Sequence, residues 1–382
     1  MDLWFWLSAL ATLEAMSNVI TTLEQINVAW LTNVLRRNGA LTAGEVTAVH
    51  LEPNAAFNSS IAHLQVRFSS DAAPVLPTRL LVKLNADGGG QLEIAFYRLA
   101  REQPSPVPGL VRCFAAEYDV QTEHSVLMLE DLSETHVTPT VRARVLALDG
   151  VPTPEQCDGV VDALAQFHAY WWQHPVVGQE PLYIVRPWFT DAERHAAHVE
   201  RRTREWQTFQ AEHGREIPAE WTALYTHALE QLPGLFQRFL EPRVTTLRAL
   251  TLSNGDAYFN QFLCPRDGGD DTRIVDFQDV GGNFGAFDLV YLLPTFWMRA
   301  QRLEHDRERR LLRRYLDGLH AHGVSGYGWD DLVTDYRVIL AHMVFDVVWN
   351  AASGSSAAYW QPKMRCLLEA YEDWDCARLL EG

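Results

Sequence analysis

Two aspartates and two neighbouring side-chain amides form the pattern in this sequence that most directly suggests chemistry. The stretch TLSNGDAYFNQFLCP (residues 251–265) carries Asp256, with Asn260 and Gln261 four and five residues later, and the stretch IVDFQDV carries Asp276. Both aspartates are flanked by apolar residues, so we expect two poorly solvated carboxylates that require a cation between them. Carboxylate, amide and phosphate oxygens are the ligands that Mg²⁺ prefers, so the pattern outlines phosphoryl-transfer chemistry.

A purely structural interpretation of the same two residues stays open at this point. Asp256 would close a Gly-Asp turn, and Asp276 would cap the segment that follows it. This is a common role for a single aspartate, so the segment around the two aspartates does not by itself decide between structure and function.

A second pair of charged residues lies in the first third of the chain. Lys83 is the single cation of the apolar stretch LLVKLN, and Glu93 follows ten residues later in a segment with helical spacing. A buried lysine needs a partner, and Glu93 is placed to be one. The order of a strand lysine, a helix glutamate, the acidic dipeptide Glu130-Asp131 and two aspartates further on is typical of protein-kinase-like folds.

The elements that would position these residues follow from the hydrophobic spacing. We expect a helix in residues 21–41, and alternating apolar residues predict strands at 46–51, 61–68 and 79–84. A helix at 91–103 and two returning strands, 111–119 and 125–132, complete a small antiparallel sheet. From Thr153, which opens a capping box with Gln156, most of the chain is predicted to be helical. The exception is a short hairpin around the Gly268-Gly269-Asp270-Asp271 turn, and we expect Asp256 and Asp276 to lie on its adjacent strands.

Composition limits the class of protein. The chain has 382 residues and a formal net charge of −17, without a basic cluster, which argues against a nucleic-acid partner. Five widely spaced cysteines predict neither disulfides nor a zinc site, and they favour a reducing cytoplasm. The apolar start, residues 1–16, contains Asp2 and is too short to span a bilayer, so we expect an amphipathic leader and no stable membrane insertion.

At this point the sequence resembles the superfamily of small-molecule kinases that contains aminoglycoside phosphotransferases, choline kinases and ecdysteroid kinase-like proteins. The resemblance covers about residues 46–295 and rests on six stretches: LLVKLN, LEIAFYRLA, SVLMLEDL, DALAQFHAYWW, NGDAYFNQFLCP and IVDFQDVGGNFGAFDLVYLL. It implies an α+β, bilobal protein-kinase-like fold. Residues 1–132 would form a small nucleotide-binding lobe with an antiparallel sheet and leading helices. Residues 133–382 would form a mainly helical lobe with the catalytic hairpin and acceptor site.

The resemblance also implies cofactors and residue roles. Asp256 would be catalytic, ATP and Mg²⁺ would be the cofactors, and a small hydroxylated molecule would be the acceptor. Metal ligation would fall to Asp276 and to Gln261 or Asn260. The nucleotide would be bound by Lys83 paired with Glu93, by the backbone around Leu129, Glu130 and Leu132, and by Ser59 and Ser60 beside Asn58.

The catalytic loop departs from the superfamily pattern HGDxxxxN at two positions. Asn254 stands at the histidine position, where its amide can brace the backbone as a donor and an acceptor. Gln261 stands at the asparagine position and carries the same amide one methylene further out. Asn260 would take the ligand role after a slip of one residue, but that slip would turn Phe262 and Leu263 away from their inward side, so we favour Gln261. These departures motivate an alternative function, a pseudokinase-like protein that binds a nucleotide or small molecule with impaired catalysis.

The acceptor is not identified by the sequence, and an aminoglycoside, an amino alcohol and a steroid-like alcohol all stay open. The C-terminal helices would supply aromatic residues with Asp346 beside them, a combination that suits an organic cation or a flat apolar alcohol. The candidate tryptophans are Trp171, Trp172, Trp188, Trp297, Trp349 and Trp360. We expect His168 to be structural, Asp288 to cap the following helix and brace the catalytic loop, and the charged run 302–314 to be a solvated helix face.

Overall fold

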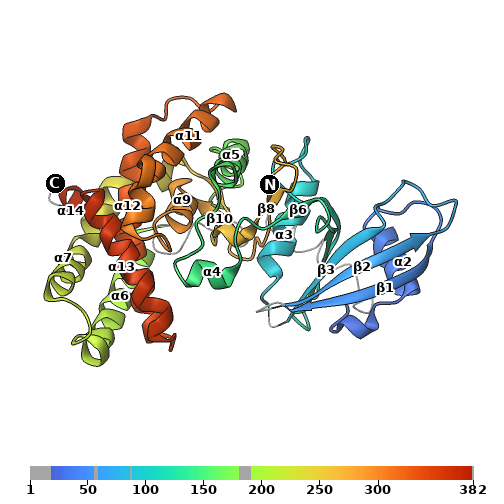
Figure 1. The fold of residues 1–382 in the computed structure, drawn as a ribbon, viewed down its shortest axis with the longest axis horizontal. Coiled ribbons are helices and arrows are strands. Elements are labelled where there is room, and N and C mark those ends of the chain that lie inside the picture. Colours follow the sequence, from blue (N-terminus) through green and yellow to red (C-terminus); the bar gives the residue numbers. More distant parts are fainter. Residues whose placement is uncertain (1–18, 56–58, 87, 180–190, 381–382) are drawn as a thin grey trace. The chain divides into compact units, whose positions relative to one another are not determined.

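The structure, a computed structural model, describes residues 19–55, 59–86, 88–179 and 191–380. The chain divides into two compact units, one comprising residues 1–98 and 112–131 and the other residues 99–111 and 132–382. The first is rich in strands and the second in helices (Figure 1). This confirms the predicted α+β class, with a small antiparallel sheet followed by a mainly helical part. The predicted leader, Asn58 and Trp188 lie outside the described residues.

The first unit is built on a five-stranded antiparallel sheet with the order β1-β2-β3-β5-β4. Its strands confirm the alternation read from the sequence. They are β1 (Val46–Ala55), β2 (Ser60–Phe68), β3 (Arg79–Asn85), β4 (Cys113–Tyr118) and β5 (Ser125–Glu130). Strand β3 lies in the middle and pairs with both β2 and β5, so a side chain in its centre is enclosed by neighbouring strands.

Helices cover this sheet and fix the environment of β3. In place of the single helix expected at 21–41, a short 3-10 turn, η1 (Leu23–Gln25), precedes α2 (Val28–Arg37). The buried α2 residues Leu31, Val34 and Leu35 join one core with Leu80 and Val82 of β3. Because strand side chains alternate, residue 83 faces away from that core. Helix α3 (Gln91–Arg101) confirms the predicted helix after β3.

The second unit contains most of the helices and, in its small sheets, the candidate catalytic loop. Its major helices are α5 (Pro154–Tyr170), α6 (Ala192–His213), α7 (Ala219–Leu235), α11 (Arg307–Ala321), α12 (Trp329–Ala352) and α13 (Ala357–Asp373). Shorter elements are α4 (Arg142–Leu146), η3 (Phe236–Leu240), α8 (Glu241–Thr246), α9 (Ala286–Leu292), α10 (Arg299–Leu303), η5 (Glu304–Asp306) and α14 (Cys376–Leu380). The predicted capping box at the start of α5 is present, with Gln156 N on Thr153 Oγ1 at 3.3 Å.

Helix α12 is the central element of this unit. It packs against α6, α9 and α13 among others, and nearly every residue from Val338 to Val348 is buried (Figure 1). A helix that is apolar on all sides is expected in the centre of a large domain. Polar residues on such a helix are therefore enclosed by protein unless they face a cavity.

The short strands of the second unit correct one expectation about the aspartates. Strand β8 (Phe262–Pro265) pairs with β6 (His136–Val137) and with β9 (Arg273–Ile274), while β7 (Thr251–Ser253) pairs with β10 (Gly281–Asn283). The hairpin of β8 and β9 exists, but Asp256 lies in the loop between β7 and the 3-10 turn η4 (Phe259–Gln261), and Asp276 lies after β9. Both aspartates were expected on strands; they lie in loops at strand ends.

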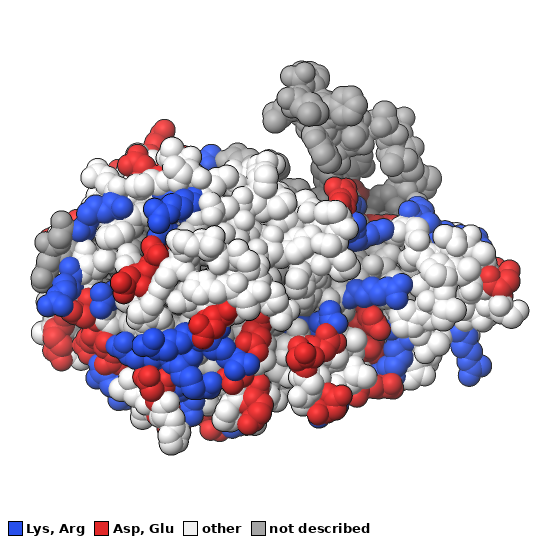
Figure 2. All heavy atoms as spheres, turned by 90° about the horizontal axis from the view of Figure 1, so that it is seen from above, with Lys and Arg blue, Asp and Glu red and all other residues white. Residues whose placement is uncertain are grey.

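The charged surface is mixed in sign. On the face drawn in Figure 2, Lys and Arg side chains lie beside Asp and Glu side chains. Ion pairs of this kind join α11 to α5, such as Arg310 with Asp158 at 2.6 Å and Arg314 with Asp162 at 2.6 Å. Within the described ranges, no helix combines the length and the apolar character needed to cross a membrane.

Candidate active site

The predicted lysine–glutamate pair is present in the first unit. Lys83 Nζ on β3 lies 2.8 Å from Glu93 Oε2 on α3, and the two side chains are only 10% and 2% exposed. The pair lies on the face of β3 that is turned away from the core beneath α2. A buried ion pair of this geometry costs desolvation and is weak evidence for stability alone, so its presence suits a functional role.

The other predicted nucleotide residues lie at two places. Ser59 and Ser60 lie where β2 begins, and Ser60 is exposed. Leu129 and Glu130 end β5, and Leu132 begins the second unit. Asp131, between them, is bound by Arg79 at 2.9 Å and by His63 at 3.0 Å, which anchors the end of β5 to the sheet.

A network around Asp288 and Asn254 holds the candidate catalytic loop. Asp288 accepts hydrogen bonds from the backbone N–H groups of Asn254 at 2.7 Å and of Gly255 at 3.0 Å. His168 is fully buried between Asp288 and the Tyr315 hydroxyl, at 3.1 and 2.8 Å, and so has the structural role that was predicted. Asp288 therefore braces the loop as expected. The prediction that it also caps the following helix is wrong, because it lies within the first turn of α9 and its carboxylate oxygens accept hydrogen bonds from the loop.

Asn254 ties the two aspartate loops together. Its Nδ2 donates to the backbone carbonyls of Val275 at 3.2 Å and Asp276 at 3.1 Å, while its Oδ1 accepts from the backbone N–H of Asp256 at 3.2 Å. This confirms the prediction that an asparagine at this position braces the backbone as both donor and acceptor.

Gln261 lies between the two candidate carboxylates. Its Nε2 is 3.3 Å from Asp256 Oδ2 and 3.1 Å from Asp276 Oδ2. Asn260, the alternative ligand, forms no hydrogen bond with either carboxylate among the described residues. The backbone carbonyl of Gln261 also accepts a hydrogen bond from the N–H of Val275. Both the side chain and the backbone of Gln261 therefore connect the two loops.

This group of oxygens suits a hard divalent cation. Gln261 Nε2 bonds both Asp256 Oδ2 and Asp276 Oδ2, so the two carboxylates lie beside the same side-chain amide. Asp276 has a φ of 61°, a left-handed conformation that costs energy for a residue with a Cβ and that often marks functional sites. Within the described residues, no three His, Cys, Asp or Glu side chains are arranged to hold a metal. A cation here would thus need the glutamine amide oxygen and oxygens of a bound phosphate, which is how Mg²⁺ is usually held.

The environment of Asp256 favours proton acceptance near neutral pH. Burial, together with the neighbouring carboxylate of Asp279, raises its pKa to about 7, although the hydrogen bond from Gln261 acts in the opposite direction. A carboxylate with a pKa near the working pH is suited to general-base chemistry.

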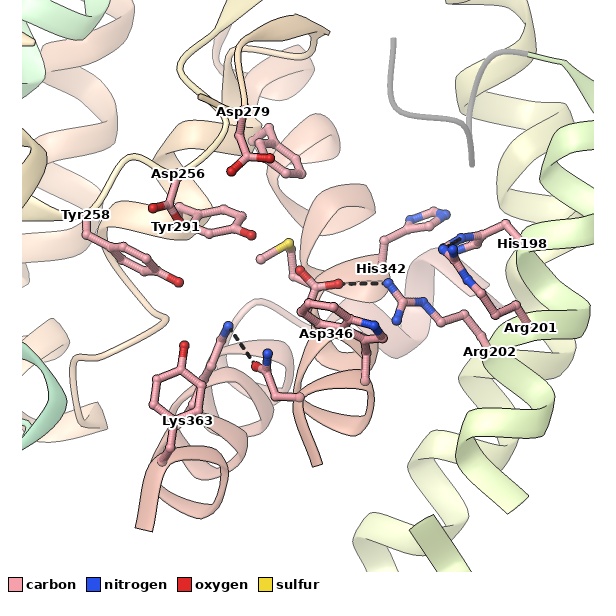
Figure 3. Close-up of a pocket in the computed structure, with 15 residues that line it drawn as sticks. His198, Arg201, Arg202, Asp256, Tyr258, Asp279, Tyr291, His342, Asp346 and Lys363 are labelled. Atoms are coloured by element: carbon pink, nitrogen blue, oxygen red, sulfur yellow. Dashed lines mark hydrogen bonds and ion pairs between the residues drawn. The ribbon is translucent and has the colours of Figure 1, made fainter. Parts of the chain in front are cut away.

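A cavity of about 450 Å³ opens beside Asp256 within the second unit. Helix α12 provides one wall with His342, Met343, Asp346, Trp349 and Asn350, which recur at helical spacing. Figure 3 shows Asp256, Asp279, Tyr258 and Tyr291 together on one side, with Lys363 below them and the α6 residues opposite. The remaining lining residues are His198, Arg201, Arg202, Phe287 and Tyr359.

Sequence reasoning missed several of these residues. Asp279 lies three residues after Asp276 in the same short stretch, and polar residues at helical spacing interrupt the apolar run of α12. The sequence contains only two lysines, Lys83 and Lys363, and both are buried. Because the other long basic side chains of this sequence are all arginines, the rare lysine at position 363 was a signal for a cavity residue.

The predicted aromatic acceptor residues are placed differently from one another. Of the six candidate tryptophans, five lie in described residues, and of these five only Trp349 lines the cavity. Trp171, Trp297 and Trp360 are core residues, 0–2% exposed, and Trp172 packs edge-on against Tyr327. Asp346 does face the cavity, but Arg202 binds it at 2.9 Å, so its charge is already compensated.

Comparison with solved structures identifies the fold. A protein assigned as an aminoglycoside phosphotransferase from Ralstonia eutropha JMP134 is similar with a TM-score of 0.55 and 13% identity, over 91% of this chain and 97% of that chain. A thermostable mutant of the aminoglycoside phosphotransferase APH(4)-Ia, in ternary complex with ADP and hygromycin B, has a TM-score of 0.51 and 11% identity, over 90% and 97% of the two chains. The predicted protein-kinase-like fold of small-molecule phosphotransferases is therefore confirmed.

The sequence of the chain then gives its family. The family model described as the ecdysteroid kinase-like family matches residues 94–324, more than half of the chain, so the chain belongs to this family. The matched segment includes Asp256, Gln261 and Asp276, whereas Lys83 and Lys363 lie outside it. No significant match was found among curated protein sequences.

Proposed function

We propose that this protein is an ATP- and Mg²⁺-dependent O-phosphotransferase that acts on a small hydroxylated molecule. The observation that carries the proposal is the meeting of Asp256 and Asp276 at Gln261, beside a cavity that Asp256 itself lines. The carboxylate of Asp256 thus lies beside both the candidate metal position and the space for an acceptor, as phosphoryl transfer requires.

In the proposed reaction Asp256 orients the acceptor hydroxyl and receives its proton. The hydroxyl oxygen forms a bond to the terminal phosphorus of ATP, the bond from that phosphorus to the bridging oxygen breaks, and ADP leaves. The raised pKa of Asp256 matches this role, because a base with a pKa near the working pH accepts a proton without being too weak. Asn254 and Asp288 keep the loop in place during the transfer.

The remaining roles concern the phosphates and the metal. Asp276 and Gln261 would hold Mg²⁺, which supplies charge neutralisation for the phosphates when bound. Lys83, held by Glu93, would contact the phosphates. Ser59, Ser60 and the backbone at Leu129, Glu130 and Leu132 are proposed to bind the nucleotide on the basis of the family resemblance alone.

One observation favours a second candidate, a pseudokinase-like protein that binds a small molecule or a nucleotide with impaired catalysis. The amide N–H group of Gln261 already bonds both carboxylates, which reduces their need for a cation. In this candidate the cavity binds its small molecule without turnover.

Two measurements on the full chain separate the candidates. The first is a calorimetric titration of ATP with and without Mg²⁺, for which we expect binding that requires the metal. The second is acceptor-dependent ADP formation, compared between the wild type and Asp256→Asn, whose near-identical shape should preserve the fold. Metal-dependent ATP binding with acceptor turnover lost in Asp256→Asn supports the enzyme. ATP binding without turnover of any hydroxylated acceptor supports the binding protein, and absence of ATP binding contradicts the enzyme and favours a protein that binds only a small molecule.

A further inference from the structure

Lys363 is a buried cation that faces the cavity without a carboxylate partner. It lies on α13 and is 2% exposed, and its Nζ forms one hydrogen bond within the described part of the chain, to Asn350 Oδ1 at a long 3.4 Å. Within the described residues, no carboxylate lies within ion-pair distance of its Nζ. Figure 3 shows the ammonium pointing into the cavity from below Tyr258 and Tyr291.

A lysine in this state is costly for the folded protein unless something else binds it. An ammonium has three N–H donors, and burial of a charged group without paired hydrogen bonds is unfavourable. Burial accordingly lowers the pKa of Lys363, while the carboxylates of Asp346 and Asp256 oppose this from a greater distance. The rings of Tyr291 and Tyr359, with centroids 5.9 and 6.0 Å from Nζ, make up for only part of the interaction with water that the ammonium loses on burial.

The positions of the charged residues in the cavity indicate which charge an acceptor can carry. Asp256 and Asp279 lie at the end where the hydroxyl would react, and Asp346 is neutralised by Arg202 at 2.9 Å. Apart from Asp256 and Asp279, the charged residues that line the described cavity are Arg201, Arg202 and Asp346, which form ion pairs, and Lys363, which forms none. A polycationic acceptor would bring further positive charge into this buried space, and like charges in a low-dielectric site repel strongly.

We propose that Lys363 is a specificity-determining residue that binds a carbonyl-type oxygen of the acceptor, either of a carboxylate or of a ketone. This inference rests on the proposed function, because it places the acceptor hydroxyl at Asp256 and its oxygen-bearing group at Lys363. Two free N–H donors and the aromatic walls suit a hydroxylated molecule with an apolar body and one such oxygen group.

Four matched probes test the proposal without nucleotide. The compounds meta-hydroxybenzoate, meta-hydroxyacetophenone, meta-hydroxybenzyl alcohol and meta-hydroxybenzylamine share a ring and a hydroxyl group and differ only in a carboxylate, ketone, alcohol or ammonium group. Each is titrated into the full chain, and Kd is measured by NMR. We expect the carboxylate or the ketone to bind at least about tenfold more tightly than the ammonium probe, because a hydrogen bond to a charged donor is worth about that much.

Variants of α13 connect this selectivity to one side chain. Lys363→Met should abolish the preference, and Lys363→Arg should keep it. Arg365→Met is the matched control, because it removes a positive charge from the same helix at an exposed position that does not line the cavity. Circular dichroism of each variant verifies folding, and the selectivity of the wild type stands as a test even if Lys363→Met does not fold.

The outcomes separate the sources of the oxygen and also the two proposals. Preference for the carboxylate indicates an acidic acceptor, and equal binding of the ketone indicates a neutral carbonyl acceptor. An ammonium probe that binds as tightly as the carboxylate, a preference retained in Lys363→Met, or no saturation by the carboxylate or the ketone probe overturns the inference. Because no ATP is present, these results do not depend on turnover, and a failure of phosphoryl transfer would be seen only in the ADP assay.

Discussion

Asn254 donates a hydrogen bond from its side-chain amide to the backbone carbonyl of Asp276 at 3.1 Å, so one residue of the β7 loop fixes the loop that carries the second aspartate. The same side chain accepts from the backbone N–H of Asp256 at 3.2 Å. One asparagine, at a position where the superfamily pattern has histidine, thus bonds the backbones of both aspartates.

Removing this asparagine should affect metal-dependent nucleotide binding more than stability alone explains. Asn254→Ala leaves buried carbonyl groups without a donor, and we expect a loss of about 2 kcal/mol in the free energy of unfolding together with weaker ATP binding in Mg²⁺. Asn283→Ala is the matched control, because Asn283 is also buried and bonds the backbone of Phe284, but it contacts neither aspartate. Equal ATP affinity in the two variants would contradict the bracing role.

Substitution of the two neighbouring amides tests which of them serves the metal. Gln261→Ala removes the side chain that contacts both carboxylates, and we expect the Mg²⁺-dependent part of ATP binding to fall by about tenfold or more. Asn260→Ala should have a smaller effect, because Asn260 has no hydrogen bond with either aspartate. Calorimetric Kd values at several Mg²⁺ concentrations provide the comparison, and a larger effect of Asn260→Ala would assign the ligand to that residue instead.

The Lys83–Glu93 pair allows stability and nucleotide binding to be separated. Lys83→Met removes the cation that lies 2.8 Å from the buried carboxylate of Glu93, and it should cost about 3–5 kcal/mol of unfolding free energy. The double variant Lys83→Met/Glu93→Leu should recover most of that stability, because it replaces the whole pair with apolar side chains. ATP affinity should stay low in both variants. Recovery of ATP affinity in the double variant would show that the lysine has no part in binding phosphate.

Buried histidines beside the cavity predict a loss of stability in acid. Burial lowers the pKa of His195 from 6.5 to about 4, and that of His342 to about 3. Since the unfolded chain then binds protons that the folded chain does not, the free energy of unfolding should decrease as the pH falls below 6.5. His195→Phe, at a position stacked 4.5 Å from Phe236, should remove up to about 2 kcal/mol of the decrease between pH 7 and pH 5.

The control for this experiment keeps the histidine and changes its neighbour. Phe236→Leu removes the stacked ring but no titratable group, so it should lower stability by a similar amount at both pH values. Chemical denaturation at pH 7 and pH 5 measures each difference. An unchanged pH dependence in His195→Phe would mean that this side chain is accessible to protons in the folded state.

The parts of the structure that the sequence predicted well depend on local patterns. Alternation identified β1, β2 and β3, and the four-residue capping box identified the start of α5. The Lys83–Glu93 pair was predicted because a charge in the middle of an apolar strand needs a partner near in sequence. The bracing by Asn254 was predicted from its donor and acceptor groups, which depend on residue type and loop position.

The parts that were missed depend on contacts between distant segments. The strands around Asp256 and Asp276 are two to four residues long, too short for alternation to place a residue on or beside them. The run at 302–314 was expected to be solvated, but Arg302 is fully buried and bonds Glu308 at 2.8 Å and Asp373 at 2.7 Å, because α13 covers it. Similarly, the cavity exists only where α6, α12 and α13 meet, so the position of Lys363 could not follow from its neighbours in the chain.

The burial of both lysines has a practical consequence for chemical labelling. Reagents that acylate side-chain amines find only two such groups in this sequence, and neither is freely accessible in the folded chain. Acylation at position 363 would therefore report access to the cavity, and acylation at position 83 would report opening of the pair with Glu93. Mass spectrometry of the two lysine-containing peptides, with and without candidate ligands, would read each site separately, with no background from surface lysines.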